Sequence, residues 1–550
     1  MPLRSGNFCL RTRLTLSALF FFAASLATAQ TAITTYHVDN NRTGWNSHET
    51  VLTPANVGSS SFGLLHTVTL SGQIDAQPLF VPGVNITAGK YQGVHDVVYV
   101  ATEEDNIYAI DAEAGTILLS PSFGTPGGLP TACGNTRTKV GINATPVIDS
   151  TSNTLYVVIN ELGSTGTPAY WVHALDLGSL TDKVAPQLVV ASHTLADGTT
   201  FNFNAAYQRQ RPALLLTNDT IYAGFGSFCD SNASITRGML LGWSTGSLTP
   251  LPTNQTLDTQ ATSPNDYFLS SIWMSGYGPS TDDSGNILFV TGNSDPSGTT
   301  YNGITDIQES VVKVSSNLTT VLSVFTPSNQ PSLDASDDDF GAGGVMVLPD
   351  QPGFVPHLAV AAGKKGSLFL MNEDSLGGFS TTKDNVLGIY SIGACWCGPS
   401  YFVDPSDGVG RVVTSGNYSV KVFKVETTGK RTSLSKVSSS PTIVGVNHPG
   451  FFTTISSNGT SNPIIWAASH PTDATGYPLY LYAFNPESVS GGIMKQLLMI
   501  EAGNGNSNLV PVVADGEVFV ASNSQLQIFG IIPAAKNGEA ALSREAKKKP

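Results

Sequence analysis

One phrase recurs along this chain, and it constrains the fold more than any other feature. The phrase is a short strand ending in a turn, an alternating apolar strand, a second strand and a glycine turn. Its first copy contains Gln77–Val81, Val97–Ala101 and Ile107–Asp111, followed by Gly115. Later copies begin near Thr145, Arg211, Ile287, Gly344, Pro399, Pro441 and Pro511. A repeat of about 40 to 70 residues is typical of small sheets that pack against copies of themselves.

The repeat predicts the fold class. Each copy is a small antiparallel sheet that cannot bury both of its faces alone, and packing in a ring buries them against each other. We therefore expect an all-β chain with a single eight-bladed β-propeller of four-stranded antiparallel blades over residues 60–532. A spare strand, Phe62–Leu70, precedes the first copy, and the last copy is short. We expect this early strand to complete the last blade, with residues 30–59 as an N-terminal extension.

Composition excludes several classes of protein. Charged residues make up 12% of the 550 residues, and the formal net charge is -14. An acidic chain with few Lys and Arg is a poor nucleic-acid binder, so no nucleic acid is expected as a partner. Hydrophobic residues reach 41%, which is not a disordered composition. Coiled coils need a chain rich in Glu, Lys, Leu and Ala, and this chain does not have that composition.

The N-terminus has the pattern of a secretory signal peptide. Arg4, Arg11 and Arg13 precede the apolar run Leu14–Leu26, and Ala27-Thr28-Ala29 supplies the small-residue cleavage pattern. We expect residues 1–29 to be removed and the mature chain to be periplasmic or extracellular. The alternative is a retained anchor, but the run is too short to span a membrane comfortably, and no later run is long enough. Residues 533–550 are expected to be a disordered basic tail.

Four cysteines follow the signal peptide: Cys133, Cys229, Cys395 and Cys397. Disulfides form in exported proteins, and four cysteines allow three pairings, among which the sequence does not choose. Cys395 and Cys397 flank Trp396 in a C-x-C pattern. No cluster of histidines accompanies this pair, so a disulfide or buried thiol is favoured over a metal site.

Acidic residues give the best lead to a functional site, because the common nucleophile, zinc and phosphate-binding motifs are absent from the sequence. Asp337-Asp338-Asp339 precede the glycine-rich run Phe340–Gly344. Neighbouring carboxylates repel unless they are solvated or share a cation such as Ca²⁺. The alternative is a solvated acidic loop. Asp230 and Asn293 also lie in loops between strands, and Lys364-Lys365 form a tight basic turn whose alternative is an ordinary hairpin turn.

The repeat resembles the pyrroloquinoline quinone (PQQ)-like propeller repeat. That superfamily contains eight-bladed quinoprotein alcohol dehydrogenases and non-enzymatic binding propellers. A closer resemblance, to secreted bacterial PQQ-like repeat proteins of unassigned function, rests on three segments: Tyr36–Gly44, Leu52–Val57 and Asp339–Gly344.

The resemblance to the dehydrogenases implies a set of site residues. Trp273 matches the tryptophan beneath the quinone, and its alternative is an aromatic packed in a blade. Lys364 or Lys365 would bind the quinone. Asn293, Asp230 and Asp337 would bind calcium, and Asp338 or Asp339 would be the catalytic base. In that mechanism Ca²⁺ polarises the quinone carbonyl while the aspartate removes the alcohol proton.

Three departures from the dehydrogenase pattern shape the functional prediction. This chain has no adjacent Cys-Cys pair, an Asp replaces the usual Glu ligand, and the Trp-Asp pair before the glycine-rich loop is missing. The sequence therefore predicts an exported scaffold that binds a protein, glycan or small molecule through its loop face. The alternative is a PQQ- and Ca-dependent quinoprotein dehydrogenase that oxidises alcohols or sugars. For that alternative, the site residues must meet at one end of the central channel.

Overall fold

The computed structural model describes Met1 and residues 31–533, apart from 131–138, 195–197, 199, 229–235, 253–254, 257–270, 294–306, 444–449, 470–477 and 505–508. The predicted signal peptide beyond Met1, the tail from residue 534, Cys133, Cys229 and Asp230 lie outside the described residues. No helix in the described part of the chain combines the length and the apolar character needed to cross a membrane.

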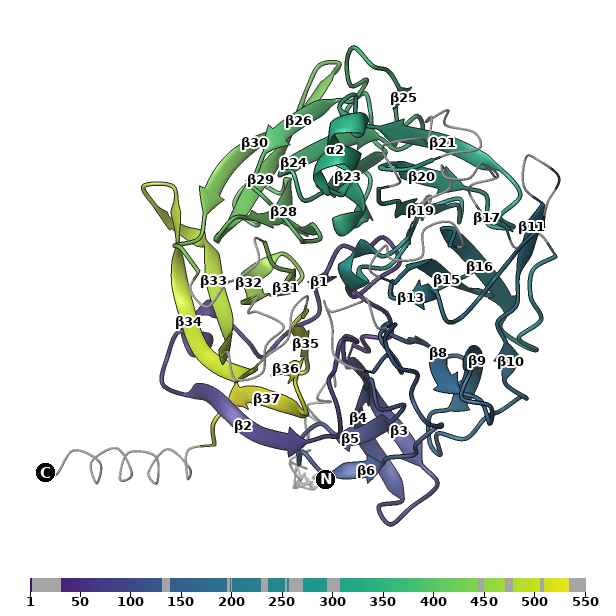
Figure 1. Cartoon of the computed structure of the whole chain (residues 1–550). Coiled ribbons are helices and arrows are strands. Elements are labelled where there is room, and N and C mark those ends of the chain that lie inside the picture. Colours follow the sequence, from purple (N-terminus) through teal and green to yellow (C-terminus); the bar gives the residue numbers. More distant parts are fainter. Residues whose placement is uncertain are drawn as a thin grey trace, which may run out of the picture.

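Four-stranded antiparallel sheets stand radially around a common centre (Figure 1). Their strands follow chain order, because short turns join each apolar run to the next. The first sheet contains β3 (Leu79–Ile86), β4 (Gly93–Ala101), β5 (Ile107–Asp111) and β6 (Ile117–Leu119). The second contains β7 (Val147–Asp149), β8 (Thr154–Leu162), β9 (Pro168–Asp176) and β10 (Gln187–Leu188), and a hairpin of β11 (Ser192–Thr194) and β12 (Thr200–Asn202) follows it.

The third sheet has a divided inner strand. It contains β13 (Gln208–Gln210) and β14 (Leu215–Thr217), which both pair with β15 (Thr220–Ser227), and then β16 (Met239–Ser244) and β17 (Gln255–Thr256). Pro212 lies between β13 and β14, and a proline has no backbone N–H to give to a ladder. The next sheet contains β18 (Ser280–Thr281), β19 (Ile287–Val290), β20 (Val311–Val314), β21 (Val321–Thr326) and β25 (Gly378–Phe379).

Further sheets repeat the arrangement. One contains β22 (Val345–Val347), β23 (Leu358–Ala362), β24 (Ser367–Asn372) and β26 (Gly388–Ser391). Two four-stranded units share a larger sheet: β27 (Ser400–Val403), β28 (Gly410–Gly416), β29 (Ser419–Thr428) and β30 (Arg431–Ser439), then β31 (Thr453–Asn458), β32 (Ser461–Ala468), β33 (Pro478–Ser490) and β34 (Ile493–Asn504). A single parallel pairing, Ser439 with Ile493, links the two units.

The last sheet confirms the predicted closure of the ring. β35 (Val512–Ala514), β36 (Glu517–Ser522) and β37 (Gln525–Ile531) come from the end of the chain, and β2 (Phe62–Thr69) pairs antiparallel with β37 as the outer strand. The first and last parts of the propeller are therefore held together by a ladder of backbone hydrogen bonds.

One predicted strand was wrong. The copy expected to begin at Pro441 has its inner strand at Thr453–Asn458 instead, and Pro441, Thr442 and Ile443 form no strand. Pro441 lacks a backbone N–H, whereas β31 pairs on both sides, with β32 and with β1 (Trp45–Asn46). Two apolar runs lie between β30 and β32, and only the second of them forms the inner strand.

The centre of the ring is filled by the N-terminal segment. Residues 33–46, which we call the axial segment, run through the middle to β1 (Figure 1). Their backbone groups bond to the inner strand of one sheet after another: Ile33 with Phe80, Thr34 with Ile148, Asn40 with Thr281, Asn41 with Val347, Thr43 with Tyr401 and Gly44 with Ile455. Side chains reach two further sheets, since Arg42 donates to Leu214 O and Asn46 to Val513 O. Residues 33–46 of the predicted N-terminal extension thus lie inside the ring.

Arg42 anchors the axial segment. Its side chain is 0% exposed. The guanidinium donates five hydrogen bonds, to the carbonyls of Tyr36, Asp39, Pro279 and Leu214 and to the hydroxyl of Thr35, at 2.7–3.3 Å. A buried cation is tolerated only when all its donors are satisfied, so these bonds fix the segment in one position.

Four short helices complete the described structure. α1 (Pro54–Val57) follows the axial segment, and Thr53 and Asn56 form a capping box at its start. The 3₁₀ turn η2 (Met274–Gly276) precedes β18, and α2 (Gln330–Ser336) and η3 (Phe340–Ala342) precede β22. These last three elements carry or flank the predicted site residues.

Candidate functional site

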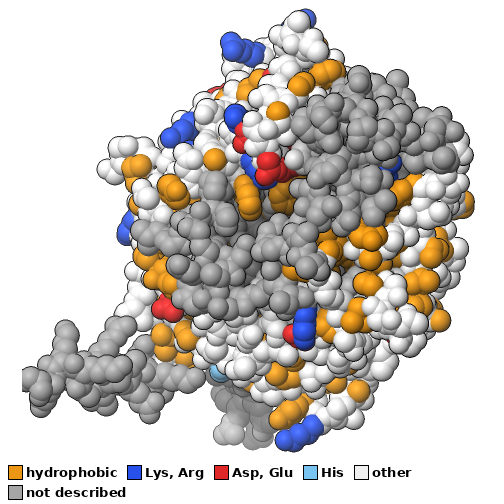
Figure 2. All heavy atoms as spheres, viewed as in Figure 1, with side chains coloured by type: hydrophobic (Ala, Val, Ile, Leu, Met, Phe, Trp, Pro, Cys, Tyr) orange, Lys and Arg blue, Asp and Glu red, His pale blue; other side chains and the backbone are white. Residues whose placement is uncertain are grey.

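The predicted site residues come from loops at one face of the ring. Trp273 directly precedes η2, and Asn293 follows β19. Asp337–Asp339 lie between α2 and η3, and Lys364-Lys365 lie between β23 and β24. Loops before the first strand and after the second strand of a blade open on the same side, because successive strands alternate in direction. Acidic and basic side chains lie together on this face in Figure 2.

Lys364 joins two of the three aspartates. Its Nζ lies 2.5 Å from Asp339 Oδ2 and 3.1 Å from Asp337 Oδ1. Asn293 holds the same pair, because its backbone N donates to Asp339 Oδ1 at 3.0 Å and its Nδ2 to Asp337 Oδ1 at 3.3 Å. The Asp339 side chain is 4% exposed and that of Asp337 70%. The carboxylates therefore do not stand alone in solvent; they share one ammonium.

Two indole rings flank that ammonium. Lys364 Nζ lies 5.6 Å from the ring centroid of Trp273 and 5.3 Å from that of Trp396. The two rings meet edge to face with centroids 6.4 Å apart. A cation within about 6 Å of an indole face is attracted by the ring quadrupole. Burial lowers the pKa of Lys364, but Asp339 and Asp337 outweigh it and raise the pKa above its ordinary value, so the amine stays charged.

Trp396 was missed as a site residue. In the sequence it is only the middle residue of Cys395-Trp396-Cys397, and no other predicted site residue lies near it in the chain. In the structure the sulfur atoms of Cys395 and Cys397 lie at bonding distance, and both cysteines are buried. This short closed turn holds Trp396 beside Trp273, which belongs to a segment more than a hundred residues earlier.

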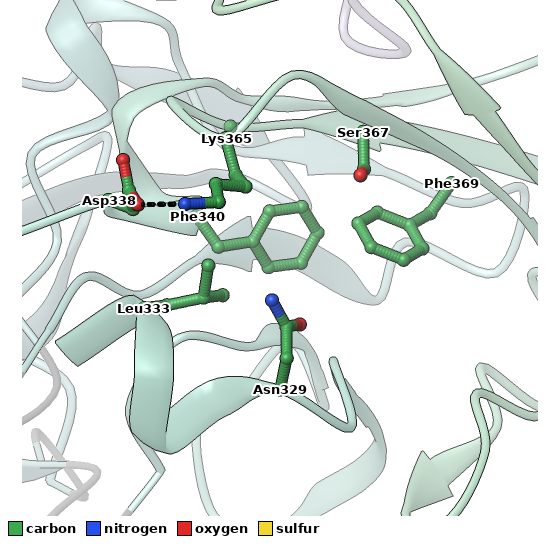
Figure 3. Close-up of a pocket in the computed structure, with 8 residues that line it drawn as sticks. Asn329, Leu333, Asp338, Phe340, Lys365, Ser367 and Phe369 are labelled. Carbon is green, nitrogen blue, oxygen red and sulfur yellow. Dashed lines mark hydrogen bonds and ion pairs between the residues drawn. The ribbon is translucent and has the colours of Figure 1, made fainter. Parts of the chain in front are cut away.

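The third aspartate takes a separate partner. Asp338 Oδ2 lies 2.7 Å from Lys365 Nζ. This pair lies at the edge of a pocket between α2 and β24, drawn in Figure 3. Phe340 and Phe369 form its apolar wall. Asp338 and Lys365 therefore do not join the Lys364 cluster, and the three neighbouring aspartates divide between two lysines.

Glu309 was also missed. It is fully buried just before β20, its Oε2 accepts a hydrogen bond from Phe340 N at 2.5 Å, and its Oε1 has no partner. Burial raises the pKa of Glu309 well above its ordinary value, and the charges of Asp339 and Asp334 raise it further. Its backbone is left-handed, with φ at 49°. A carboxylate inside an apolar strand phrase, in a chain with few charges, was the signal that could have found it.

Tyr277 connects three of the loops that carry the site. Its ring packs between Gly344 and Gly398, where an added Cβ would overlap the ring. Gly344 follows the aspartates, Gly398 follows Cys397, and Tyr277 follows Trp273 by one turn. The tyrosine hydroxyl lies 3.0 Å from Arg42 O and 3.1 Å from Pro399 O. Both positions must be glycine because the Tyr277 ring lies so close to them. Through its hydroxyl, Tyr277 also links the site to Arg42 of the axial segment.

Comparison with known proteins finds solved structures that are similar to this one. No protein-family model matches the sequence, and no curated protein matches it. The structure is similar to quinohemoprotein alcohol dehydrogenase from Comamonas testosteroni, with 12% identity, 91% of this chain and 81% of that chain covered, and a TM-score of 0.57. It is also similar to quinohemoprotein alcohol dehydrogenase ADHIIG from Pseudomonas putida HK5, with 13% identity, coverages of 91% and 80%, and a TM-score of 0.59.

A europium-containing methanol dehydrogenase completes the comparison, with 10% identity, coverages of 91% and 98%, and a TM-score of 0.57. The chain has the β-propeller fold of the quinoprotein dehydrogenases. The resemblance recognised in the repeat is confirmed at the level of the fold. The roles assigned to Trp273, Asn293, Asp337–Asp339, Lys364 and Lys365 remain predictions, as does that of Asp230.

The side chains as placed do not fit calcium and a quinone. Calcium takes six to eight oxygen ligands, but the position between Asp337 Oδ1 and Asp339 Oδ2 is filled by the ammonium of Lys364. A flat cofactor stacked on the face of Trp273 that Lys364 covers would displace this ammonium. Within the described ranges, no cluster of three or more His, Cys, Asp or Glu side chains is placed to hold a metal ion. As placed, the ammonium of Lys364 therefore occupies the position that calcium would need between Asp337 and Asp339.

Proposed function

We propose that this protein is an exported, eight-bladed propeller that binds a small-molecule ligand at its loop face, without chemical conversion. One observation carries the proposal. Lys364 is held between two carboxylates and two indole faces, which is a recognition geometry that needs no cofactor to be complete. Aromatic faces beside a few fixed charges are the usual lining of a small-molecule site.

The same geometry argues against Asp339 as a catalytic base. A general base must lie within hydrogen-bond reach of the substrate proton. Asp339 Oδ1 already accepts from Asn293 N, and Oδ2 is paired with Lys364. Because the side chain is also nearly buried, a substrate hydroxyl would have to displace the ammonium first. We therefore assign these contacts to ligand binding, in which partners of Lys364 are exchanged for the ligand.

The test is a thermal-shift and calorimetry screen of the purified mature chain against sugars, amines, organic acids and PQQ. We expect at least one class to bind, and Trp396→Phe and Lys364→Met to weaken that binding about tenfold or more. Lys383→Met is the matched control, because Lys383 is exposed in the structure. Ligand affinity that is unchanged in both site variants would overturn the proposal. Robust dye-linked oxidation of alcohols by protein loaded with PQQ and Ca²⁺ would also overturn it.

The second candidate is a PQQ- and Ca-dependent dehydrogenase. It is favoured by the convergence of Trp273, Asn293, Asp339 and Lys364, which the sequence resemblance required of such an enzyme. Reconstitution with PQQ and Ca²⁺, followed by dye reduction with short alcohols, tests it. Activity abolished by Asp339→Asn would support the dehydrogenase; no uptake of PQQ would exclude it. Export itself is checked by locating the tagged protein in cell fractions.

A further inference from the structure

Arg211 is a cation with no hydrogen-bond or ion-pair partner among the residues that the structure describes. It lies between β13 and β14, it is partly buried, and its Nε is buried without a hydrogen bond. The side chain makes no hydrogen bond or ion pair with the described residues. By contrast, Arg42 donates to four carbonyls and a hydroxyl, and Arg411 pairs with Asp404 at 2.9 Å. Leaving a guanidinium partly desolvated and unpaired costs free energy, which an anion would offset.

The charges around Arg211 do not supply that anion. Arg209 adds a second positive charge, and burial together with Arg211 lowers the pKa of Arg209 to about 10. Asp75 and Glu103 lie near Arg209, but burial and Asp75 raise the pKa of Glu103 well above its ordinary value. Arg209 and Arg211 therefore place two guanidinium groups near each other, and this concentration of positive charge favours an anion.

A second unpartnered group lies beside it. Tyr36 of the axial segment is 3% exposed, and its hydroxyl is buried with no hydrogen-bond partner. Arg211 and Arg42 both act electrostatically on this phenol, and burial, the larger effect, raises its pKa above the ordinary value. The hydroxyl therefore keeps its proton and can donate it to an acceptor. Buried polar groups are rarely left unpaired, so each such group needs an explanation.

The ring of Tyr36 and the backbone just after Arg211 contact the segment that carries Trp273. Ala213, two residues after Arg211, donates its backbone N–H to Gly276 O at 3.3 Å. The ring of Tyr36 meets that of Tyr277 edge-on, with centroids 5.3 Å apart. Trp273, Gly276 and Tyr277 belong to one short stretch of chain. The backbone near Arg211 and the ring of Tyr36 are thus packed against the short stretch that also carries Trp273.

We propose that Arg211 and Tyr36 form an oxyanion subsite, and that the ligand of the loop face is a small organic acid. Its carboxylate would accept hydrogen bonds from the Arg211 guanidinium and the Tyr36 hydroxyl, and its remaining part would lie toward Trp273 and Lys364. Guanidinium groups bind planar carboxylates through two parallel hydrogen bonds, and these are among the stronger polar contacts in proteins. This proposal rests on the proposed ligand-binding function and adds the chemical class of the ligand.

The experiment measures binding of citrate, inorganic phosphate and neutral glycerol to the mature chain by calorimetry at low and high salt. We expect citrate to bind more tightly than phosphate, and glycerol not to bind. Arg211→Gln should weaken citrate binding about tenfold or more, and Tyr36→Phe about threefold to tenfold. Arg211→Lys should restore part of the affinity. Arg431→Gln is the matched control, because Arg431 is exposed at the start of β30.

The outcomes separate the subsite from the proposed function. Citrate affinity unchanged in Arg211→Gln overturns the subsite, and so does a preference for phosphate. If Arg211→Gln abolishes binding while Lys364→Met and Trp396→Phe do not affect it, the subsite stands and the proposed site is wrong. If a neutral ligand from the screen binds and depends only on Lys364 and Trp396, the proposed site stands and the subsite is wrong. Unchanged thermal unfolding of Arg211→Gln and Tyr36→Phe confirms that both variants are folded.

Discussion

The axial segment and the loop-face site are both polar, and both lie near the centre of the ring, but they satisfy their polar groups in different ways. Arg42 and the backbone of residues 33–46 bond almost entirely to main-chain groups of the surrounding sheets. Lys364 bonds mainly to other charged side chains, and 12% of its side chain is exposed. Main-chain partners fix an architecture, whereas side-chain partners near solvent can be exchanged for a ligand.

The largest effect is expected at the centre of the ring. Arg42→Met should destabilise the protein by about 3–5 kcal/mol, because it leaves the carbonyls of Pro279 and Leu214 buried without a donor. Urea unfolding measures the change. Arg431→Met, at an exposed position, should change stability by less than about 0.5 kcal/mol. Equal effects of the two variants would show that the axial segment does not hold the sheets together.

A smaller loss is expected where the two regions meet. Gly344→Ala should cost about 2–3 kcal/mol, since its Cβ would overlap the ring of Tyr277. The near-ultraviolet circular dichroism of the Trp273–Trp396 pair should change as well, because Tyr277 connects their loops. Gly246→Ala is the control, as nothing lies within 4 Å of its added Cβ. An unchanged spectrum in a destabilised Gly344→Ala variant would mean that Tyr277 does not position the tryptophans.

The carboxylate of Asp105 has no hydrogen-bond partner among the described residues. We therefore expect this residue to make the stability of the protein depend on pH. It is 0% exposed, both its oxygens lack hydrogen bonds, and burial with the charges of Glu161 and Glu104 raises its pKa to about 8. The unfolded chain releases this proton near pH 4, so stability should fall as pH rises from about 4 to 8. Asp105→Asn should remove that part of the slope and stabilise the protein at pH 8 by about 1–2 kcal/mol. Urea midpoints across this range test it, and a slope that persists in the variant contradicts it.

The smallest effect is expected at the exposed ion pair. Lys365→Met should cost less than about 1 kcal/mol, because Lys365 is 55% exposed and solvent screens its pairing with Asp338. Lys364→Met should cost more, since it leaves the nearly buried carboxylate of Asp339 without its ammonium. Thermal unfolding of the two variants side by side gives the comparison. A larger loss of stability for Lys365→Met than for Lys364→Met would contradict this prediction.

Much of the site was predictable because it follows the repeat. Asn293 and Lys364 occupy loops at equivalent places in consecutive copies of the strand phrase, and Asp337–Asp339 precede the first strand of a copy. Once copies of one phrase are stacked in a ring, equivalent loops must open on the same face. Trp396, Glu309 and Tyr277 were not predictable in this way. Their roles depend on side-chain contacts between copies, which no period in the sequence encodes.

By itself, the sequence determined the radial sheets and their closure by β2, because alternating apolar strands can bury both faces only against copies of themselves. The tertiary structure alone decided that Tyr36–Gly44 fills the centre of the ring. That segment has no strand or helix period, and residues such as His37, Val38 and Arg42 have positive φ angles. Its conformation is stabilised by hydrogen bonds to inner strands up to several hundred residues away, and those partners exist only once the ring has formed.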